Sequence, residues 1–114
     1  MKYNLSNRTV LKIFIGSPND LNEERKITNN IVERINKHLA RNLNLVVELR
    51  GWEDTLPGFS RPQSKINEDV RNCDLFLGLI YKRWGTPTGV TTSGFKEEFD
   101  IAYERMKNGE LKDI

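Results

Sequence analysis

The sequence of 114 residues predicts a single α/β domain built on a parallel sheet. Three apolar segments typical of strands alternate with segments whose apolar residues recur at helical spacing. Strands and helices that alternate in this way form parallel sheets with right-handed crossovers, which leave few topologies open. The simplest is the flavodoxin-like arrangement, in which the strands lie in the order 2-1-3 and helices cover both faces.

The first strand and helix are predicted near the N-terminus. Residues 10–15 form a short run of β-branched and aromatic side chains, interrupted by one lysine, which is typical of a strand. Residues 16–20 follow as its exit loop. Ser17 is placed to cap a helix whose first residue would be Pro18, so we expect the helix to start there. Its isoleucines recur at steps of four, which indicates that one side of the helix packs against the sheet and that the rest is exposed to solvent.

The middle of the chain predicts a second strand and a short helix. Residues 43–49 are rich in valine and leucine and partly alternate with polar residues, as in a strand. Residues 51–62 carry two prolines and two glycines and form a loop too long for a simple turn. A short helix is expected over residues 63–72.

The last strand and helix follow directly. Residues 74–81 are almost continuously apolar, which suggests burial on both faces and hence a central position in the sheet. The final helix is predicted from about residue 93 to 108, with Gly109 as its stop. Because residues 111–114 come where a fourth strand would be due, we expect the chain to be the N-terminal part of a longer protein.

Composition excludes several classes of function. The 18 basic and 16 acidic residues are interspersed and leave a net charge of +2, so there is no electrostatic case for nucleic acid as the main partner. No run reaches the roughly 18 apolar residues that a membrane-spanning helix needs. One cysteine permits no intramolecular disulfide, and the N-terminus lacks the features of a signal peptide. We therefore expect a cytoplasmic protein that does not bind membranes.

The strand order predicts where a ligand would bind. In the order 2-1-3, the switch point lies between the first and third strands, and ligands bind beyond the carboxyl ends of the strands there. The loops at that point are residues 16–18 and 81–93. Gly16 and Ser17 precede a predicted helix, so their backbone N–H groups could receive a phosphate. The commoner role of such a pair is simple helix capping, and both interpretations stay open.

Two adjacent carboxylates open the last helix. Glu97 and Glu98 point about 100° apart on a helix and cannot share one task. Phe95, Phe99 and Ala102 mark the packed side, which puts Glu98 at its border and Glu97 toward solvent. A carboxylate near a helix N-terminus is most often only stabilised by the helix dipole, and a catalytic role for Glu98 is the alternative.

Other reactive residues have simpler interpretations. His38 lies near the end of the first helix on its polar side, where a solvated imidazole is expected. Cys73 has no histidine near it in the sequence and is interpreted as a small core residue. Trp52 and Glu53 are expected to anchor the long loop rather than to line the cleft. No set of metal ligands can be assembled.

Two motifs carry a resemblance to a known family. Residues 12–25, KIFIGSPNDLNEER, and residues 74–87, DLFLGLIYKRWGTP, stand in this order, followed by SGF and EEF from residue 93 onward. Together they resemble the TIR-like domain of unknown function found at the N-termini of NACHT and other STAND-type ATPases. The resemblance covers nearly the whole chain and implies a flavodoxin-like fold, related to TIR domains and nucleoside deoxyribosyltransferases, over residues 1–114.

The resemblance also implies a chemistry. Those relatives cleave or transfer at N-glycosidic bonds, and the transferase pattern of glutamate, three residues and alanine is matched by Glu98 and Ala102. It implies hydrolysis of NAD⁺ or a related nucleotide as substrate, with Glu98 catalytic, Glu97 as the alternative register, and neither cofactor nor metal required. The residues expected to bind the nucleotide are Gly16, Ser17, Trp84, Gly85 and Thr86, with Trp84 stacking on a ring.

Two other functions remain open at this point. Many TIR domains assemble with one another without catalysis, so the chain could be an oligomerisation or protein-interaction module. It could also sense a nucleotide without cleaving it. In each case the resemblance implies an effector or signalling domain of an antiviral defence protein, whose partners are a nucleotide and further copies of the same protein.

Overall fold

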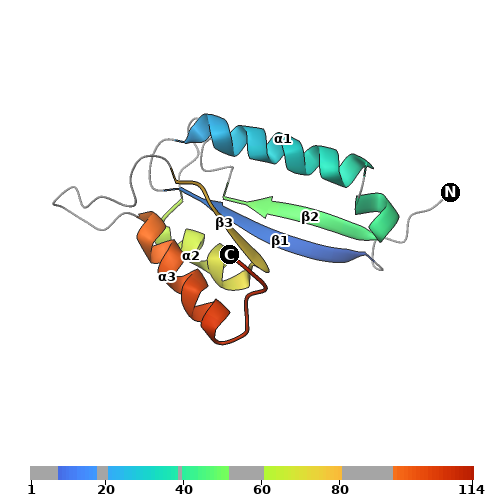
Figure 1. Cartoon of the computed structure of the whole chain (residues 1–114). Coiled ribbons are helices and arrows are strands. Elements are labelled where there is room, and N and C mark those ends of the chain that lie inside the picture. Colours follow the sequence, from blue (N-terminus) through green and yellow to red (C-terminus); the bar gives the residue numbers. More distant parts are fainter. Residues whose placement is uncertain (1–7, 18–20, 39, 52–60, 81–93) are drawn as a thin grey trace.

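The computed structural model describes residues 8–17, 21–38, 40–51, 61–80 and 94–114 (Figure 1). Strands and helices alternate along these ranges, as the sequence predicts. The elements are β1 (Thr9–Gly16), α1 (Asn22–His38), the 3-10 helix η2 (Ala40–Leu43), β2 (Leu45–Arg50), α2 (Gln63–Asn72), β3 (Leu75–Gly78) and α3 (Gly94–Lys107). None of the described helices has the length and apolar character needed to cross a membrane.

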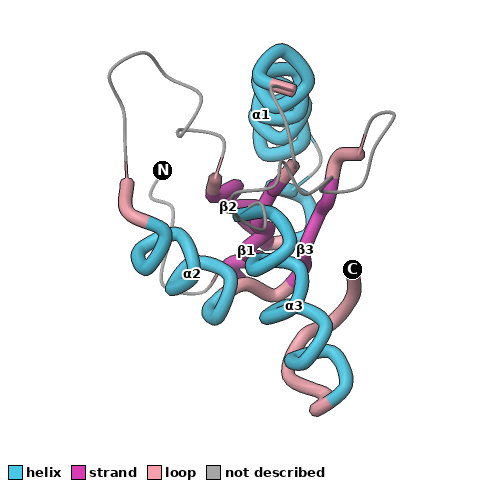
Figure 2. The backbone as a smooth tube through the Cα atoms, turned by 90° about the vertical axis from the view of Figure 1, so that its left-hand side faces the viewer, coloured by secondary structure: helices cyan, strands magenta, loops and turns pink. Residues whose placement is uncertain are grey.

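The sheet has the predicted order and direction. Its three strands lie in the order β2-β1-β3, and β1 is parallel to both neighbours. Helix α1 covers one face, whereas α2 and α3 lie together on the other (Figures 1 and 2). The prediction of a flavodoxin-like α/β arrangement is therefore confirmed for the described part of the chain.

Alternating side chains of β1 divide the core between the two faces. Ile15 is fully buried in a cluster under α1, together with Val32 from that helix. Phe14 is fully buried in the cluster under α2 and α3. Its ring stacks on Phe76 of β3 with centroids 5.7 Å apart. Because successive side chains of a strand point to opposite faces, one short strand supplies the centre of both clusters.

The predicted start of the first helix is wrong. The first helix begins at Asn22, five residues after Ser17, and its first bond runs from Arg25 N to Leu21 O at 2.9 Å. Its first turn carries two acidic residues, which the helix dipole favours at that end, so the helix starts where they are rather than after Ser17. Pro18 itself lies outside the described residues.

The third strand is not central. Strand β1 holds the middle position, and β3 covers only Leu75–Gly78, with Leu77 39% exposed. The apolar run of residues 74–81 continues beyond the strand through Ile80, which is half-exposed, while residue 81 lies outside the described residues. A run of apolar residues marks a strand but does not fix where its hydrogen-bonded partner ends.

The two outer edges of the sheet are treated differently. On β2, the Asn36 side chain of α1 donates to Val47 O at 2.8 Å and accepts from Val47 N at 2.7 Å. On β3, Leu75 forms a parallel bridge with Asp113, and Phe76 N donates to Asp113 O at 3.1 Å. A side-chain amide thus takes the place of a neighbouring strand at β2, and the segment after α3 lies against β3.

Candidate functional site

The candidate site lies where the central strand and β3 end. Gly16 and Gly78 are register partners at the last positions of their strands, and Leu79 N donates to Gly16 O at 2.8 Å. Helix α3 begins with Gly94 at the same end of the sheet (Figure 1). This is the predicted switch point, because α1, which follows β1, and α3, which follows β3, lie on opposite faces of the sheet.

Glu98 lies directly over the end of β1. Its side chain comes from the second turn of α3 and only 7% of the residue is exposed. A Cβ atom built on Gly16 would come within 2.8 Å of Glu98 Oε1, and within 3.3 and 3.4 Å of the Phe14 and Phe95 rings. The carboxylate can hold this position only because Gly16 has no side chain, so Gly16 and Glu98 form one arrangement.

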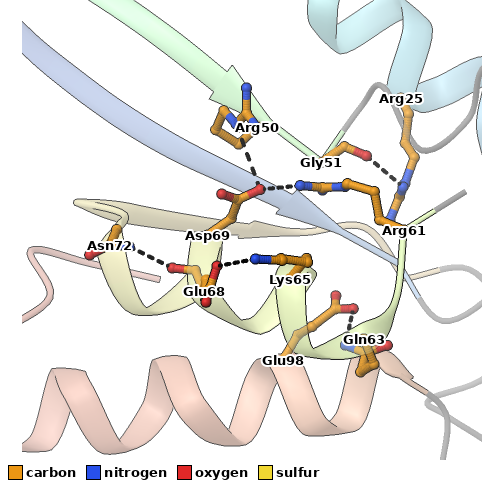
Figure 3. A network of polar contacts seen from close by, with 10 residues as sticks. All are labelled: Arg25, Arg50, Gly51, Arg61, Gln63, Lys65, Glu68, Asp69, Asn72 and Glu98. Atoms are coloured by element: carbon orange, nitrogen blue, oxygen red, sulfur yellow. Dashed lines mark hydrogen bonds and ion pairs between the residues drawn. The ribbon is translucent and has the colours of Figure 1, made fainter. Parts of the chain in front are cut away.

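A glutamine holds the second carboxylate oxygen. Gln63, the first residue of α2, donates from Nε2 to Glu98 Oε2 at 3.1 Å (Figure 3). The same nitrogen donates to Asn67 Oδ1 at 2.9 Å, and Asn67 Nδ2 donates to Glu97. Four polar side chains therefore connect α2 with the first turns of α3.

The predicted division between the two glutamates is confirmed. Glu98 is buried on the packed side and Glu97 is exposed. Glu97 is nevertheless engaged, since it accepts from Asn67. Sequence reasoning missed Gln63 and Asn67, although one signal was present: Asn67 stands four residues after Gln63 and three before Val70, the spacing of residues on one face of a helix. The structure buries Asn67 and Val70 on that face.

Ser17 is bound to a side chain rather than acting as a helix cap. Arg25 of α1 donates from Nε to Ser17 Oγ at 3.1 Å and from a terminal nitrogen to Gly51 O at 3.0 Å. One guanidinium thereby joins the carboxyl ends of β1 and β2. Since the helix begins at Asn22, its N-terminal amides do not belong to Gly16 and Ser17.

Further arginines lie at this end of the sheet. Arg61 donates to Asp69 Oδ2 at 2.7 Å, and Arg50, the last residue of β2, lies 3.6 Å from the same oxygen (Figure 3). With Arg25, three guanidinium groups lie near the carboxyl ends of β1 and β2, and the carboxylates of Asp69 and Glu98 lie in the same network.

The other candidate residues have no part in this arrangement. Cys73 is buried, with its thiol directed to Val70 O at 3.2 Å. Burial raises the pKa of the Cys73 thiol, although the neighbouring Arg105 guanidinium lowers it. A protonated, enclosed thiol fits the predicted core role, and His38 is exposed at the end of α1.

Several predicted residues lie outside the described ranges. They are Trp52, Glu53, Trp84, Gly85 and Thr86. Within the ranges that are described, no group of three or more histidine, cysteine, aspartate or glutamate side chains could hold a metal ion. The described part of the site consists of a buried carboxylate, an amide network and arginines.

Comparison with known proteins places the chain in a family. The model of the family described as Domain of unknown function (DUF4062) matches residues 12–109 of the 114. The match runs from within β1 to just beyond α3 and includes Gly16, Gln63 and Glu98, and the chain belongs to this family. No curated protein and no solved structure matches it.

Proposed function

We propose that this member of the DUF4062 family hydrolyses the N-glycosidic bond of NAD⁺ or a related nucleotide, with Glu98 as its catalytic carboxylate. The observation that carries the proposal is the position of Glu98, buried over Gly16 at the carboxyl ends of β1 and β3. Ligands of open α/β sheets bind at that edge, next to the switch point.

A carboxylate in this position suits the chemistry of the bond. When the bond between ribose C1′ and the nicotinamide nitrogen breaks, its electron pair leaves with nicotinamide, which departs as a neutral molecule. Positive charge then develops on the ribose, and a fixed carboxylate stabilises it. Water adds to C1′ and releases a proton, which gives ADP-ribose. The low exposure of Glu98 strengthens its attraction for the developing charge.

The surroundings of Glu98 suit the rest of a dinucleotide. Arg25, Arg50 and Arg61 bring guanidinium groups to the carboxyl edge, and guanidinium groups pair well with phosphate oxygens. Gly16 faces Glu98, and Ser17 accepts from Arg25, so both are assigned to the ribose and phosphate part of the proposed site. Trp84, Gly85 and Thr86, which lie outside the described residues, are assigned to nucleotide binding by the resemblance, with Trp84 stacking on a ring.

The wider setting belongs to the same proposal. The two motifs of this chain resemble TIR-like domains at the N-termini of NACHT and other STAND-type ATPases. This resemblance supports an effector or signalling role in cytoplasmic defence. In that role, assembly of the attached ATPase would bring several copies together, and the nucleotide would be consumed in response.

The test is the substitution Glu98→Gln. The amide keeps the length of the side chain, and its oxygen can still accept from Gln63, so the fold is preserved while the charge is lost. In Glu98→Gln we expect the rate of nicotinamide release from NAD⁺, measured by chromatography, to fall by about 10²–10³-fold. Glu97→Gln is the matched control on the neighbouring residue, and it should keep most of the activity.

The proposal is rejected if the unaltered protein, concentrated or within its assembled full-length form, releases no nicotinamide from NAD⁺. Calorimetric titration with NAD⁺ and ADP-ribose then separates the two remaining functions. Binding that depends on Glu98 but brings no turnover identifies a nucleotide sensor. Absence of binding, together with self-association, identifies an oligomerisation module.

A further inference from the structure

The hydrogen bonds between α2 and α3 have a fixed direction. An ionised carboxylate only accepts hydrogen bonds, so the amides between Glu98 and Glu97 have to donate toward both ends. Gln63 Nε2 donates to Glu98 at 3.1 Å, and Asn67 Nδ2 donates to Glu97. The link between the amides runs from Gln63 Nε2 to Asn67 Oδ1 at 2.9 Å. Each donor meets an acceptor, and the chain is consistent throughout.

The side-chain amide of Gln63 is held in one of its two orientations. Gln63 Oε1 lies against Gly94, where a Cβ atom would come within 2.5 Å of it. If the amide rotated by 180°, Oε1 would face two other acceptors, Glu98 Oε2 and Asn67 Oδ1. Like-charged oxygens in contact are unfavourable, particularly beside Asn67, which is only 7% exposed. The amide is therefore held with its nitrogen toward Glu98.

From this geometry we propose that Gln63 is the positioning residue of the site. It holds the carboxylate of Glu98 in its ionised form and fixes Oε2, so that Oε1, over Gly16, is the oxygen presented to the ribose. The role in catalysis rests on the proposed function. The control of Glu98 ionisation by Gln63 does not, and it can be measured on the protein without any substrate.

The effect of charged neighbours on the ionisation of Glu98 is separate from that of the neutral Gln63 side chain. On its own helix, Glu97 is connected to Glu98 through Asn67 and Gln63. On α2, Lys65 lies 3.8 Å from Glu68, and Asp69 binds Arg61. Gln63, which carries no charge, contacts Glu98 directly. Removing the Gln63 donor therefore alters the environment of the carboxylate without removing a charge.

The decisive variant is Gln63→Met, which keeps the length of the side chain and removes the donor. Carbon NMR of the side-chain carboxyl groups follows the titration, and the Glu98 signal is identified by its absence from Glu98→Gln. We expect the Glu98 titration midpoint to rise by about one pH unit in Gln63→Met, because a hydrogen bond to the charged form is lost.

A second variant and a control complete the measurement. Gln63→Glu places another carboxylate about 3 Å away, so the pair should titrate in two steps, the upper one shifted further than in Gln63→Met. Ser64→Ala changes the exposed neighbour on α2 and should leave Glu98 unshifted. Thermal unfolding verifies that each variant is folded.

The kinetic arm uses the same variants. If NAD⁺ is hydrolysed, the acid limb of the kcat profile should move to higher pH by the shift measured in the NMR titration, with little change in KM. If Gln63 only supports packing, its substitution would lower the unfolding temperature but would leave the NMR titration of Glu98 and the pH profile of kcat unchanged.

Two failures are distinguishable. An unaltered protein that does not release nicotinamide ends the proposed function, but the NMR titration still decides whether Gln63 controls Glu98. If the Glu98 midpoint is the same in the unaltered protein and in either folded variant, the role assigned to Gln63 is wrong.

Discussion

A larger residue would be unfavourable at Gly16, Gly51 and Gly109 for three different physical reasons. At Gly16 a Cβ atom would meet the far end of the Glu98 side chain, 2.8 Å away. At Gly51 the backbone has a φ of +100°, and a Cβ atom would come within 2.4 Å of Ile15 O. Gly109 also has a positive φ, of +75°, but nothing lies within 4 Å of the position of its Cβ. The three positions therefore separate side-chain contact from backbone strain.

The same substitution to alanine should give three different results. Gly109→Ala carries only backbone strain and should cost about 1 kcal/mol. Gly51→Ala adds a clash with the main chain and should cost about 2–4 kcal/mol. Gly16→Ala should cost about 1 kcal/mol because Glu98 can move aside, yet abolish nicotinamide release. Urea unfolding and the activity assay measure these effects, and equal losses at Gly51 and Gly109 would contradict the assignment.

Single residues were predictable where local geometry decides their position. Helical periodicity separates Glu98 from Glu97, and the structure buries the former. Gln63 was not predictable in this way, because its contact with Glu98 joins residues 35 positions apart. For Ser17, in contrast, the sequence predicted a role that the structure does not show. Its pattern is that of a helix cap, but the guanidinium of Arg25 binds its hydroxyl instead.

At the scale of elements, one arginine joins three segments. Arg105 of α3 donates from the same terminal nitrogen to Val70 O at 2.8 Å and to Cys73 O at 2.7 Å. Its other terminal nitrogen donates to Glu110 O at 3.0 Å. Val70 O also accepts from Cys73 N at 3.5 Å and from the Cys73 thiol at 3.2 Å, so the guanidinium adds a shorter, charged donor at the end of α2 and ties this end to α3.

Arg105→Met should destabilise the protein by about 2–3 kcal/mol, because Cys73 O loses its charged donor and Val70 O is left with the longer contacts from Cys73. Arg105→Lys should recover only part of this loss, since an ammonium group cannot reproduce the planar fork. Lys107→Met on the same helix is the control, with an expected change below about 0.5 kcal/mol. Chemical denaturation measures all three. A loss at Arg105 no larger than that at Lys107 would show that the fork is not stabilising.

The order of elements was predictable, but their limits were less so. Alternation of apolar runs and helical periodicity predicts the order β2-β1-β3, which the structure confirms. The apolar run at residues 74–81 suggests a longer and central strand. Strand β3 ends at Gly78, because its hydrogen-bonded partner β1 ends at Gly16. Tertiary pairing, which the sequence does not display, fixes such limits.

At the scale of the whole molecule, the core extends beyond the family match. The match ends at residue 109, whereas Leu111 is only 5% exposed and belongs to the cluster under α2 and α3. Lys112 N also donates to Asp74 O at 2.9 Å, which fastens this segment beside β3. The segment after α3 is therefore part of the folded unit.

Leu111→Ala should cost about 2–5 kcal/mol, the usual range for removing a buried leucine side chain. Ile114→Ala, at a residue 41% exposed, should change stability by less than about 0.5 kcal/mol. A chain shortened to end at residue 109 should unfold at lower urea concentration than the 114-residue chain. Equal midpoints for the two lengths would mean that the segment after α3 does not contribute to stability.

The Asn36 side chain, which pairs with both backbone groups of Val47, has a consequence for assembly. An exposed strand edge is a template for pairing with another chain, and the amide occupies that template at the middle of β2. On the opposite border, Asp113 already pairs with Leu75 in the parallel sense. The two borders therefore differ toward an added strand: at β2 it would have to displace the Asn36 amide from Val47, whereas at β3 it would have to displace a segment of the same chain.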